Sequence, residues 1–537
     1  MIRGNILNVF TGDIYPAEVE FSGGVITCVR RVEGNFTDII LPGFVDAHVH
    51  IESSMLTPSS FAAAAIPHGT TAVVSDPHEI ANVMGVEGVE FMLEDASHTP
   101  LKFYFTAPSC VPATPFETSG AELSAREIDD LLSRDSVVAL GEMMNFPGVI
   151  SGDEKVMEKI DAAKKLNKPV DGHAPLLSGD ELCAYIGAGI STEHECVSPE
   201  EALEKRELGM KIMAREGSSA RNLRDLAAVD CDFLVSDDIH PADLLGGHMD
   251  RILRRAVEYG VDPVKAVQMA TVNPADHYNL NTGAIAPGRA ADMVVVDNLR
   301  DFNVKRVYID GRVVAENGRY LGAPKTSHRN MNRLDIADFT AEDLKVKSDD
   351  DEVTVRVIDV FDGQIVTGEL QKRLGVNDGF VAPDPSLDVL KVSVIDRYGK
   401  GNISNGFVHG FGLKEGAIAS TVAHDSHNVI TVGTDSELME RAVDILKKTG
   451  GGLVAVSEDD QRTLELPVAG LMSDGNAEEV ASRMEDLNDF VRELGCTLSA
   501  PFMTMSFLSL LVIPELKIGD RGLFSVNEFR FVDVIVG

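Results

Sequence analysis

The chain has 537 residues, too many for one ordinary hydrophobic core, so two or three domains are expected. Hydrophobic residues make up 44% and charged residues 25% of the sequence, which excludes a disordered or membrane-embedded protein. The formal net charge of −37 would repel a phosphate backbone, so we expect no nucleic-acid partner. The same charge fits either plain solubility or a salt-rich cytoplasm.

Sequence signals for export and for membrane insertion are missing. No apolar run reaches the roughly 18 residues that a membrane span requires. The start, MIRGNILNVFTGD, lacks the hydrophobic region of a signal peptide. The six cysteines form no CxxC pair, which favours reduced thiols over disulfides or a thiolate zinc site. We therefore expect a cytoplasmic protein without a membrane partner.

The first part of the chain predicts short strands, and the part that follows predicts a barrel. Residues 1–40 contain two β-rich runs separated by a Gly-Gly turn in VEFSGGVITCVRRV. From residue 41 to 282, eight short apolar runs alternate with helix-like segments, which is typical of a (β/α)₈ barrel. The eight runs are LPGFVDAHVH, TTAVVSDPHE, LKFYFTAPSC, VVALGEMMN, KPVDGHAP, GISTEHECVS, MKIMAREGSS and CDFLVSDDIH.

Two further regions follow the predicted barrel. Short strands and tight turns return at 283–314, so residues 1–40 and 283–345 are expected to form one small β-domain. The acidic run SDDDE at 348–352 indicates a linker. Residues 353–537 mix strand and helix signals and are predicted to be a C-terminal α+β domain. The fold class is therefore α/β, with a TIM-like barrel as its centre.

Polar side chains that can bind metal lie at the ends of the predicted barrel strands. His48 and His50 are two residues apart, so on a strand their rings point to the same face. Taken singly, each such residue is better explained by a structural role, such as a turn residue, a helix cap or half of a buried ion pair. Together they lie at the face where barrel enzymes hold their active sites. The strand-end residues are His48, His50, Asp76, His78, Glu79, Glu142, His173, His194, Asp237 and Asp238.

Six of these residues form a plausible ligand set for metal. Imidazole and carboxylate without thiolate suits Mn²⁺, Fe²⁺ or Zn²⁺. One catalytic ion must keep a coordination position open for water, and six protein ligands are more than such an ion needs. Two divalent ions are therefore expected. The set comprises His48, His50, Glu142, His173, His194 and Asp237.

The same pattern resembles the amidohydrolase superfamily, whose members carry these ligands on strands one, four, five, six and eight. Many members bridge their two metals with a carboxylated lysine, but VVALGEMMNFPG contains no lysine, so Glu142 is the expected bridge. Within the superfamily, the chain is most similar to the adenine deaminase family. The similar segments are DAHVHIESSMLTP, SDPHEIANVMG, GEMMNFPGV, DGHAP, STEHE, REGSSARNL, SDDIHPADLL and HGFGLKEGAIASTVAHDSHNVITVGT.

The resemblance implies hydrolytic deamination of adenine to hypoxanthine and ammonia, in purine salvage. A hydroxide held between two ions, with Mn²⁺ or Fe²⁺ preferred and Zn²⁺ possible, would attack C6. Asp237 would accept and pass on the proton, with Asp238 as the alternative. His78 is expected to polarise the purine or shuttle a proton, unless it only belongs to a turn formed by Asp76-Pro77. The resemblance also implies that the small β-domain is a β-sandwich.

Other roles are less determined by the residue pattern. Glu79, Asn145, Ser218 and Arg221 are candidates for contacts with the base. The AHDSHN segment is either a structural turn or part of a cover that closes the purine site. The expected partners are a small purine and water, and a homo-oligomer is expected. Two alternatives remain: another binuclear amidohydrolase acting on a different aminopurine or cyclic amide, and an inactive scaffold relative.

Overall fold

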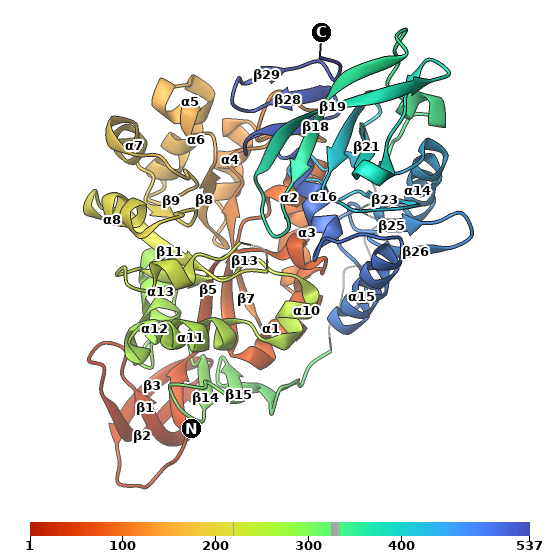
Figure 1. Ribbon diagram of the computed structural model, residues 1–537. Coiled ribbons are helices and arrows are strands. Elements are labelled where there is room, and N and C mark those ends of the chain that lie inside the picture. The colour runs from red at the N-terminus through yellow and green to blue at the C-terminus, as the bar shows by residue number, and fades with distance from the viewer. Residues whose placement is uncertain (219, 324–330, 332, 537) are drawn as a thin grey trace. The chain divides into compact units, whose positions relative to one another are not determined.

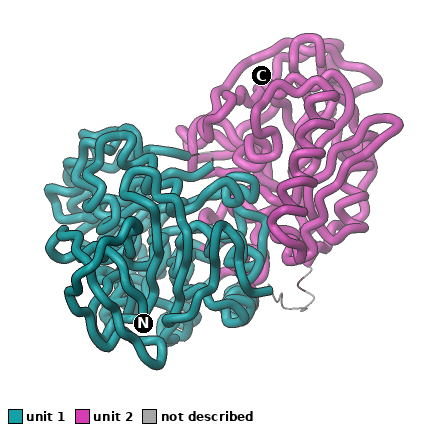
Figure 2. The backbone as a smooth tube through the Cα atoms, turned by 90° about the horizontal axis from the view of Figure 1, so that it is seen from below, with its two compact units in different colours: residues 1–78, 89–110, 123–327 teal, residues 79–88, 111–122, 328–537 magenta. Residues whose placement is uncertain are grey.

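The computed structural model describes residues 1–536, apart from 219, 324–330 and 332. Part of the expected 283–345 segment therefore lies outside the described residues. The chain forms two compact units (Figure 2). Unit 1 comprises residues 1–78, 89–110 and 123–327, and unit 2 comprises residues 79–88, 111–122 and 328–537.

Unit 1 contains the parallel barrel (Figure 1). Parallel pairing runs through the strands in chain order, with a single parallel bridge between Val170 and Ile190 joining the β9 and β10 segments, and the last strand pairs with the first. The predicted α/β barrel class is thereby confirmed. The strands are β5 (Phe44–His50), β6 (Thr70–Ser75), β7 (Lys102–Ala107), β8 (Val137–Met143), β9 (Val170–Gly172), β10 (Thr192–Glu193), β11 (Lys211–Arg215), β12 (Phe233–Val235) and β13 (Asp237–Asp238).

The barrel strands are apolar because both of their faces are covered. Val45, Val74 and Phe233 belong to one cluster of buried side chains from different strands. The eighth strand is interrupted between β12 and β13. At the interruption, the Ser236 backbone N–H and hydroxyl donate to the two oxygens of Asp46, at 3.1 and 2.5 Å. This buried carboxylate fixes the bend that precedes Asp237.

Helices follow the barrel strands, and some of them begin with a side chain that caps the helix. Ser198 accepts a hydrogen bond from the backbone of Glu201 at the start of α8, and Asp153 caps α6 in the same way. The helices are α1 (Pro58–Ala65), α3 (Val86–Ala96), α4 (Ala125–Leu132), α5 (Phe146–Ser151), α6 (Glu154–Lys165), α7 (Gly179–Gly187), α8 (Pro199–Glu207), α9 (Leu223–Leu226), α10 (Pro241–Gly246), α11 (Met249–Glu258), α12 (Pro263–Met269) and α13 (Val272–His277).

Strands from before and after the barrel share one eight-stranded sheet in unit 1. Its order is β17-β16-β15-β14-β4-β1-β2-β3. Gly23 and Gly24 both have positive φ, at 59° and 84°, and form the two-residue turn between β2 and β3. The strands are β1 (Ile2–Leu7), β2 (Ile14–Ser22), β3 (Val25–Arg31), β4 (Ile39–Pro42), β14 (Met293–Val296), β15 (Val304–Ile309), β16 (Arg312–Glu316) and β17 (Arg319–Tyr320).

Unit 2 is built on a nine-stranded sheet, β20-β19-β18-β22-β21-β24-β23-β25-β26, and a three-stranded sheet, β27-β28-β29. Gly450, at φ 81°, ends α14 and donates to the Leu446 carbonyl at 3.0 Å. The strands are β18 (Glu352–Val360), β19 (Thr367–Asn377), β20 (Phe380–Val381), β21 (Val389–Ile395), β22 (Ile403–His409), β23 (Ala417–Ser420), β24 (Val429–Gly433), β25 (Gly452–Val456), β26 (Gln461–Glu465), β27 (Leu516–Gly519), β28 (Gly522–Ser525) and β29 (Arg530–Phe531). The helices are α2 (His78–Met84, which begins in unit 1), α14 (Ser436–Thr449), α15 (Ala477–Glu493) and α16 (Pro501–Ser506).

No helix in the described ranges combines the length and the apolar character that crossing a membrane requires.

Candidate metal centre

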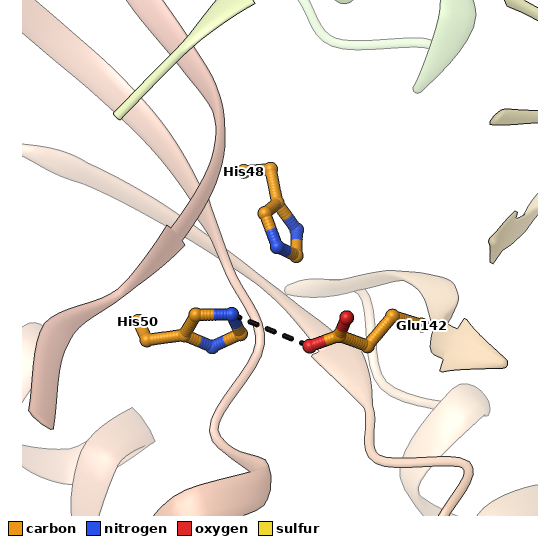
Figure 3. A group of neighbouring side chains, drawn as sticks. All are labelled: His48, His50 and Glu142. Carbon is orange, nitrogen blue, oxygen red and sulfur yellow. Dashed lines mark ion pairs between the residues drawn. The ribbon is translucent and has the colours of Figure 1, made fainter. Parts of the chain in front are cut away.

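The two oxygens of Glu142 face two different groups of histidines. His50 Nε2 lies 3.3 Å from Glu142 Oε1 (Figure 3). His173 Nδ1 and His194 Nε2 lie 2.7 and 3.2 Å from Glu142 Oε2. A carboxylate that bridges two ions must place one oxygen beside each group of ligands, and Glu142 has this arrangement.

The six predicted ligands converge at the carboxyl ends of the strands. The donor atoms of His48, His50 and Glu142 lie within 4.8 Å of one another, and so do those of Glu142, His173 and His194. Asp237 Oδ1 lies 3.2 Å from His50 Nε2 and 3.7 Å from His48 Nε2. All of these side chains are buried except that of His173, which is partly exposed.

The local backbone fixes Glu142 in this position. Its N–H donates to Asp76 Oδ2 at 2.9 Å. Gly141 precedes it, and a Cβ at that position would collide with Asp76 Oδ2 and approach Thr106 Oγ1 to 2.8 Å. The glycine of GEMMN is therefore required by the close approach of β8 to Asp76.

The donor set fits divalent cations. The buried Nε2 of His48 has no hydrogen-bond partner within the described part of the chain, as expected for an imidazole that keeps a lone pair for an ion. Burial and the neighbouring His194 and His50 lower the pKa of His48 to about 3, so its ring is neutral. Nitrogen and carboxylate oxygen without thiolate suit Mn²⁺, Fe²⁺ or Zn²⁺.

The carboxylates of the centre are ionised. Burial alone would raise the pKa of Glu142, but hydrogen bonds from His173, His194 and His50 hold this pKa well below its usual range. The pKa of Asp237 is also held well below its usual range, because His50 and Arg215 outweigh the effect of burial. Burial lowers the pKa of His194, yet Glu142 raises it to about 9, so this imidazole must lose a proton before it binds a cation.

Asp237 and Asp238 have different surroundings. Asp237 faces His50 and His48, whereas Asp238 Oδ1 accepts a hydrogen bond from the Ser53 hydroxyl at 2.5 Å. Asp237 also has a positive φ of 57°, which places its backbone in the left-handed region. Asp237 therefore has described contacts with two of the predicted histidine ligands, and the donor atoms of His50, Asp237 and Asp238 also lie within 4.8 Å of one another.

His78 also lies beside the bridging carboxylate. Its Nδ1 is 3.4 Å from Glu142 Oε1 and 3.7 Å from Asp76 Oδ1. Its ring centroid lies 4.7 Å from that of His50. His78 is thus close enough to the centre to take part in proton transfer.

Three of the four candidate substrate contacts are engaged in local hydrogen bonds. Asn145 Oδ1 accepts from Gly148 N at 2.9 Å and caps α5. The Ser218 hydroxyl donates to Asp243 at 2.6 Å and accepts from His240 N at 2.8 Å. Arg221 donates to the carbonyls of Gly217 and Ser218 at 2.8 and 3.1 Å. The described contacts of these side chains do not include the six ligands.

The fourth candidate contact, Glu79, lies in unit 2 with two histidines of the AHDSHN segment. His424 Nδ1 is 2.6 Å from Glu79 Oε1, and His427 Nε2 contacts Glu79 Oε2. The Ala423 backbone N–H donates to His427 Nδ1 at 3.2 Å, so the ring proton of His427 resides on Nε2. Glu79, His424 and His427 thus form a buried hydrogen-bonded group, and their donor atoms lie within 4.8 Å of one another.

Two buried charged residues of the centre were not anticipated from the sequence. Arg215 binds both oxygens of Glu195, and its Nη1 also donates to Asp237 Oδ2 at 2.7 Å. Glu195 Oε1 lies 3.4 Å from His194 Nε2. Arg215 ends β11, twenty residues after Glu195, so no local sequence pattern joins the two residues.

Two family models match the chain. Residues 39–314 match the amidohydrolase family, and residues 364–530 match the adenine deaminase C-terminal domain. The first match implies the use of divalent metal.

Relatives match the chain along its whole length. An adenine deaminase of Methanothermobacter thermautotrophicus is 74% identical, with 100% of both chains covered. One of Methanosphaera stadtmanae is 51% identical, covering 100% of this chain and 99% of the relative. One of Salinibacter ruber is 48% identical with the same coverage. The chain belongs to the adenine deaminase family of metal-dependent amidohydrolases.

Proposed function

We propose that this chain hydrolyses adenine to hypoxanthine and ammonia at a centre of two divalent cations. The observation that supports it most is Glu142, whose two oxygens face separate histidine groups in a chain 74% identical to an adenine deaminase. Mn²⁺ or Fe²⁺ is the proposed metal, with Zn²⁺ as the alternative. The enzyme is proposed to be a cytoplasmic homo-oligomer without membrane or nucleic-acid partners.

The proposed ligands are the six residues that converge on the barrel axis. His48, His50 and one oxygen of Glu142 would hold one ion, and His173, His194 and the other oxygen the second. Asp237 would complete the centre. Two bound ions would supply water whose pKa is lowered to roughly 7.

The reaction adds water to C6 of adenine and expels the exocyclic amine. Asp237 accepts the proton that the attacking water loses and passes it on, so that N1 is protonated as C6 becomes tetrahedral. The C6 hydroxyl then gives up its proton and the exocyclic amine gains one, so that the C6–N bond breaks, ammonia leaves and hypoxanthine remains. His78, 3.4 Å from Glu142, polarises the base or carries a proton in these steps.

Glu79, Asn145, Ser218 and Arg221 are kept as proposed contacts of the base. Since three of them now bind neighbouring groups, they would exchange local hydrogen bonds for substrate. The proposed domains are residues 1–40 with 283–345, 41–282, and 353–537.

An ammonia-release screen tests the proposal. The chain is stripped with a chelator and reloaded with Mn²⁺, Fe²⁺ or Zn²⁺ in turn. Each form is then offered adenine, adenosine, guanine and hydantoin. We expect ammonia and hypoxanthine from adenine alone, and none from the stripped protein. Absence of ammonia from adenine in every reloaded form would rule out the proposed function.

A further inference from the structure

A buried lysine, a buried glutamate and a partly exposed glutamate form an ionic group next to two of the proposed metal ligands. Lys205, on α8, is 0% exposed. Its Nζ donates to the Ala174 carbonyl at 2.7 Å and to Glu201 Oε1 at 2.7 Å, and it lies 3.2 Å from Glu193 Oε2. Two of these contacts are hydrogen bonds, and the contact with Glu193 is an ion pair. We call Lys205, Glu193 and Glu201 the Lys205 brace.

Each glutamate of the brace joins the same two loops. One loop follows β9 and begins with His173, and the other follows β10 and begins with His194. Both carboxylates accept one backbone N–H from each loop. Glu193 accepts from Ala174 at 2.9 Å and Glu195 at 2.6 Å, and Glu201 accepts from Leu176 at 2.8 Å and Val197 at 3.0 Å.

The brace therefore holds the backbone directly after two ligands. Ala174 follows His173 and Glu195 follows His194, and both histidines face the same oxygen of Glu142. We propose that the Lys205 brace positions His173 and His194 as a pair for one divalent ion. Lys205, Glu193 and Glu201 are positioning residues, since they act only through the loops.

Stability alone is a poor explanation for this group. Transferring a lysine and two carboxylates out of water costs free energy that well-packed apolar side chains do not. What the ionic group adds is fixed geometry, because four backbone N–H groups and one carbonyl are tied to the same three side chains. Fixed ligand geometry matters for metal affinity, and residues that orient metal ligands change affinity by roughly 10–100-fold when they are replaced.

The chain offers a matched control. Lys102 also bridges two carboxylates in unit 1, at 2.7 Å from Asp292 and 2.8 Å from Asp310. Asp292 accepts hydrogen bonds from Thr282 and from the Asp310 backbone, which lie outside the loops that follow His173 and His194. Lys205→Met and Lys102→Met each remove one bridging lysine. Mn²⁺ dissociation constants are measured by equilibrium dialysis, and thermal midpoints by circular dichroism without metal.

In Lys205→Met, we expect one of the two Mn²⁺ dissociation constants to rise roughly 10–100-fold while the other stays as in the wild type. In Lys102→Met, both constants should stay unchanged even where the thermal midpoint falls. Wild-type constants for both ions in a folded Lys205→Met protein would overturn the proposal, and so would an equal weakening of both.

If Lys205→Met does not fold, Glu201→Gln decides the question. This change keeps the side-chain shape but leaves one oxygen for the two loop N–H groups. A severalfold rise in the dissociation constant of one ion supports the proposed role of the Lys205 brace, and unchanged dissociation constants refute it. Since the readout is metal binding, the outcome does not depend on which substrate the enzyme uses.

Discussion

Replacing Glu142 with Gln should remove one of the two ions. The change preserves size but turns one ligand oxygen into an NH₂ group, which has no lone pair for a cation. If the remaining oxygen takes the position of Oε2, it keeps both His173 and His194, at 2.7 and 3.2 Å. The lost oxygen is then the one that faces His50 at 3.3 Å.

The magnitude follows from the kind of contact that is lost. Replacing a residue that merely orients a ligand costs roughly 10–100-fold in metal affinity, so losing a direct ligand should cost at least about 100-fold. At about 1.36 kcal/mol per tenfold change, this is about 2.7 kcal/mol for one ion. The Glu142→Gln protein should therefore bind one ion tightly and the second at least about 100-fold more weakly.

Two measurements check this expectation. Elemental analysis after dialysis gives the metal stoichiometry, and competition with a chromophoric chelator gives the dissociation constants. Glu216→Gln is the control, because Glu216 is equally buried beyond the end of β11 but pairs with Arg255 and not with the histidines. The control should keep both ions. Two ions bound with wild-type constants in Glu142→Gln would refute the bridging role.

Three further outcomes are expected from urea unfolding. Arg215→Met leaves the buried Asp237 carboxylate without its cation and should lower the free energy of unfolding by about 3–5 kcal/mol; a loss below about 1 kcal/mol would contradict the pairing. Burial raises the pKa of Asp171 from 3.8 to about 7, so the folded state binds this proton more tightly and loses stability as pH rises from about 4 to 7. Asp171→Asn should therefore be more stable than the wild type by up to about 4 kcal/mol at pH 8 and equal to it near pH 4, and a difference independent of pH would argue against a raised pKa. His427→Leu removes a donor to Glu79 and should cost about 1.5–3 kcal/mol, whereas His427→Gln should recover part of it; equal losses would show that the hydrogen bond is unimportant.

The barrel could be predicted because its signals are local. Each strand is a short apolar run that ends in a polar residue, and eight such runs alternate with helical segments. Barrel enzymes hold their active sites at the carboxyl ends of the strands, and this placed His48, His50 and Glu142 at one face. The structure also brings these three residues together. The length of each strand was less predictable, since β10 contains only Thr192 and Glu193.

The residues that surround the predicted ligands come together through contacts between segments that are distant in the sequence. Nothing near Glu195 in the sequence indicates that Arg215 binds it, and Lys205 resembles any charged residue on a helix. The assignment of residues 79–88 and 111–122 to unit 2 has the same cause, because these segments lie more than 200 residues before 328–537 in the chain. Such groupings become visible only when the chain is folded.

The left-handed backbone of Asp237 limits what can replace it. At φ 57°, most residues with a Cβ are strained, and Asn, Asp and Gly are the types that adopt this conformation readily. An alanine or glutamate here would combine a backbone cost of about 1–2 kcal/mol with the loss of the carboxylate or its displacement. Asparagine is thus the substitution that changes the charge alone. Natural variation at this position should be confined to these three residue types, even in relatives that have lost catalysis.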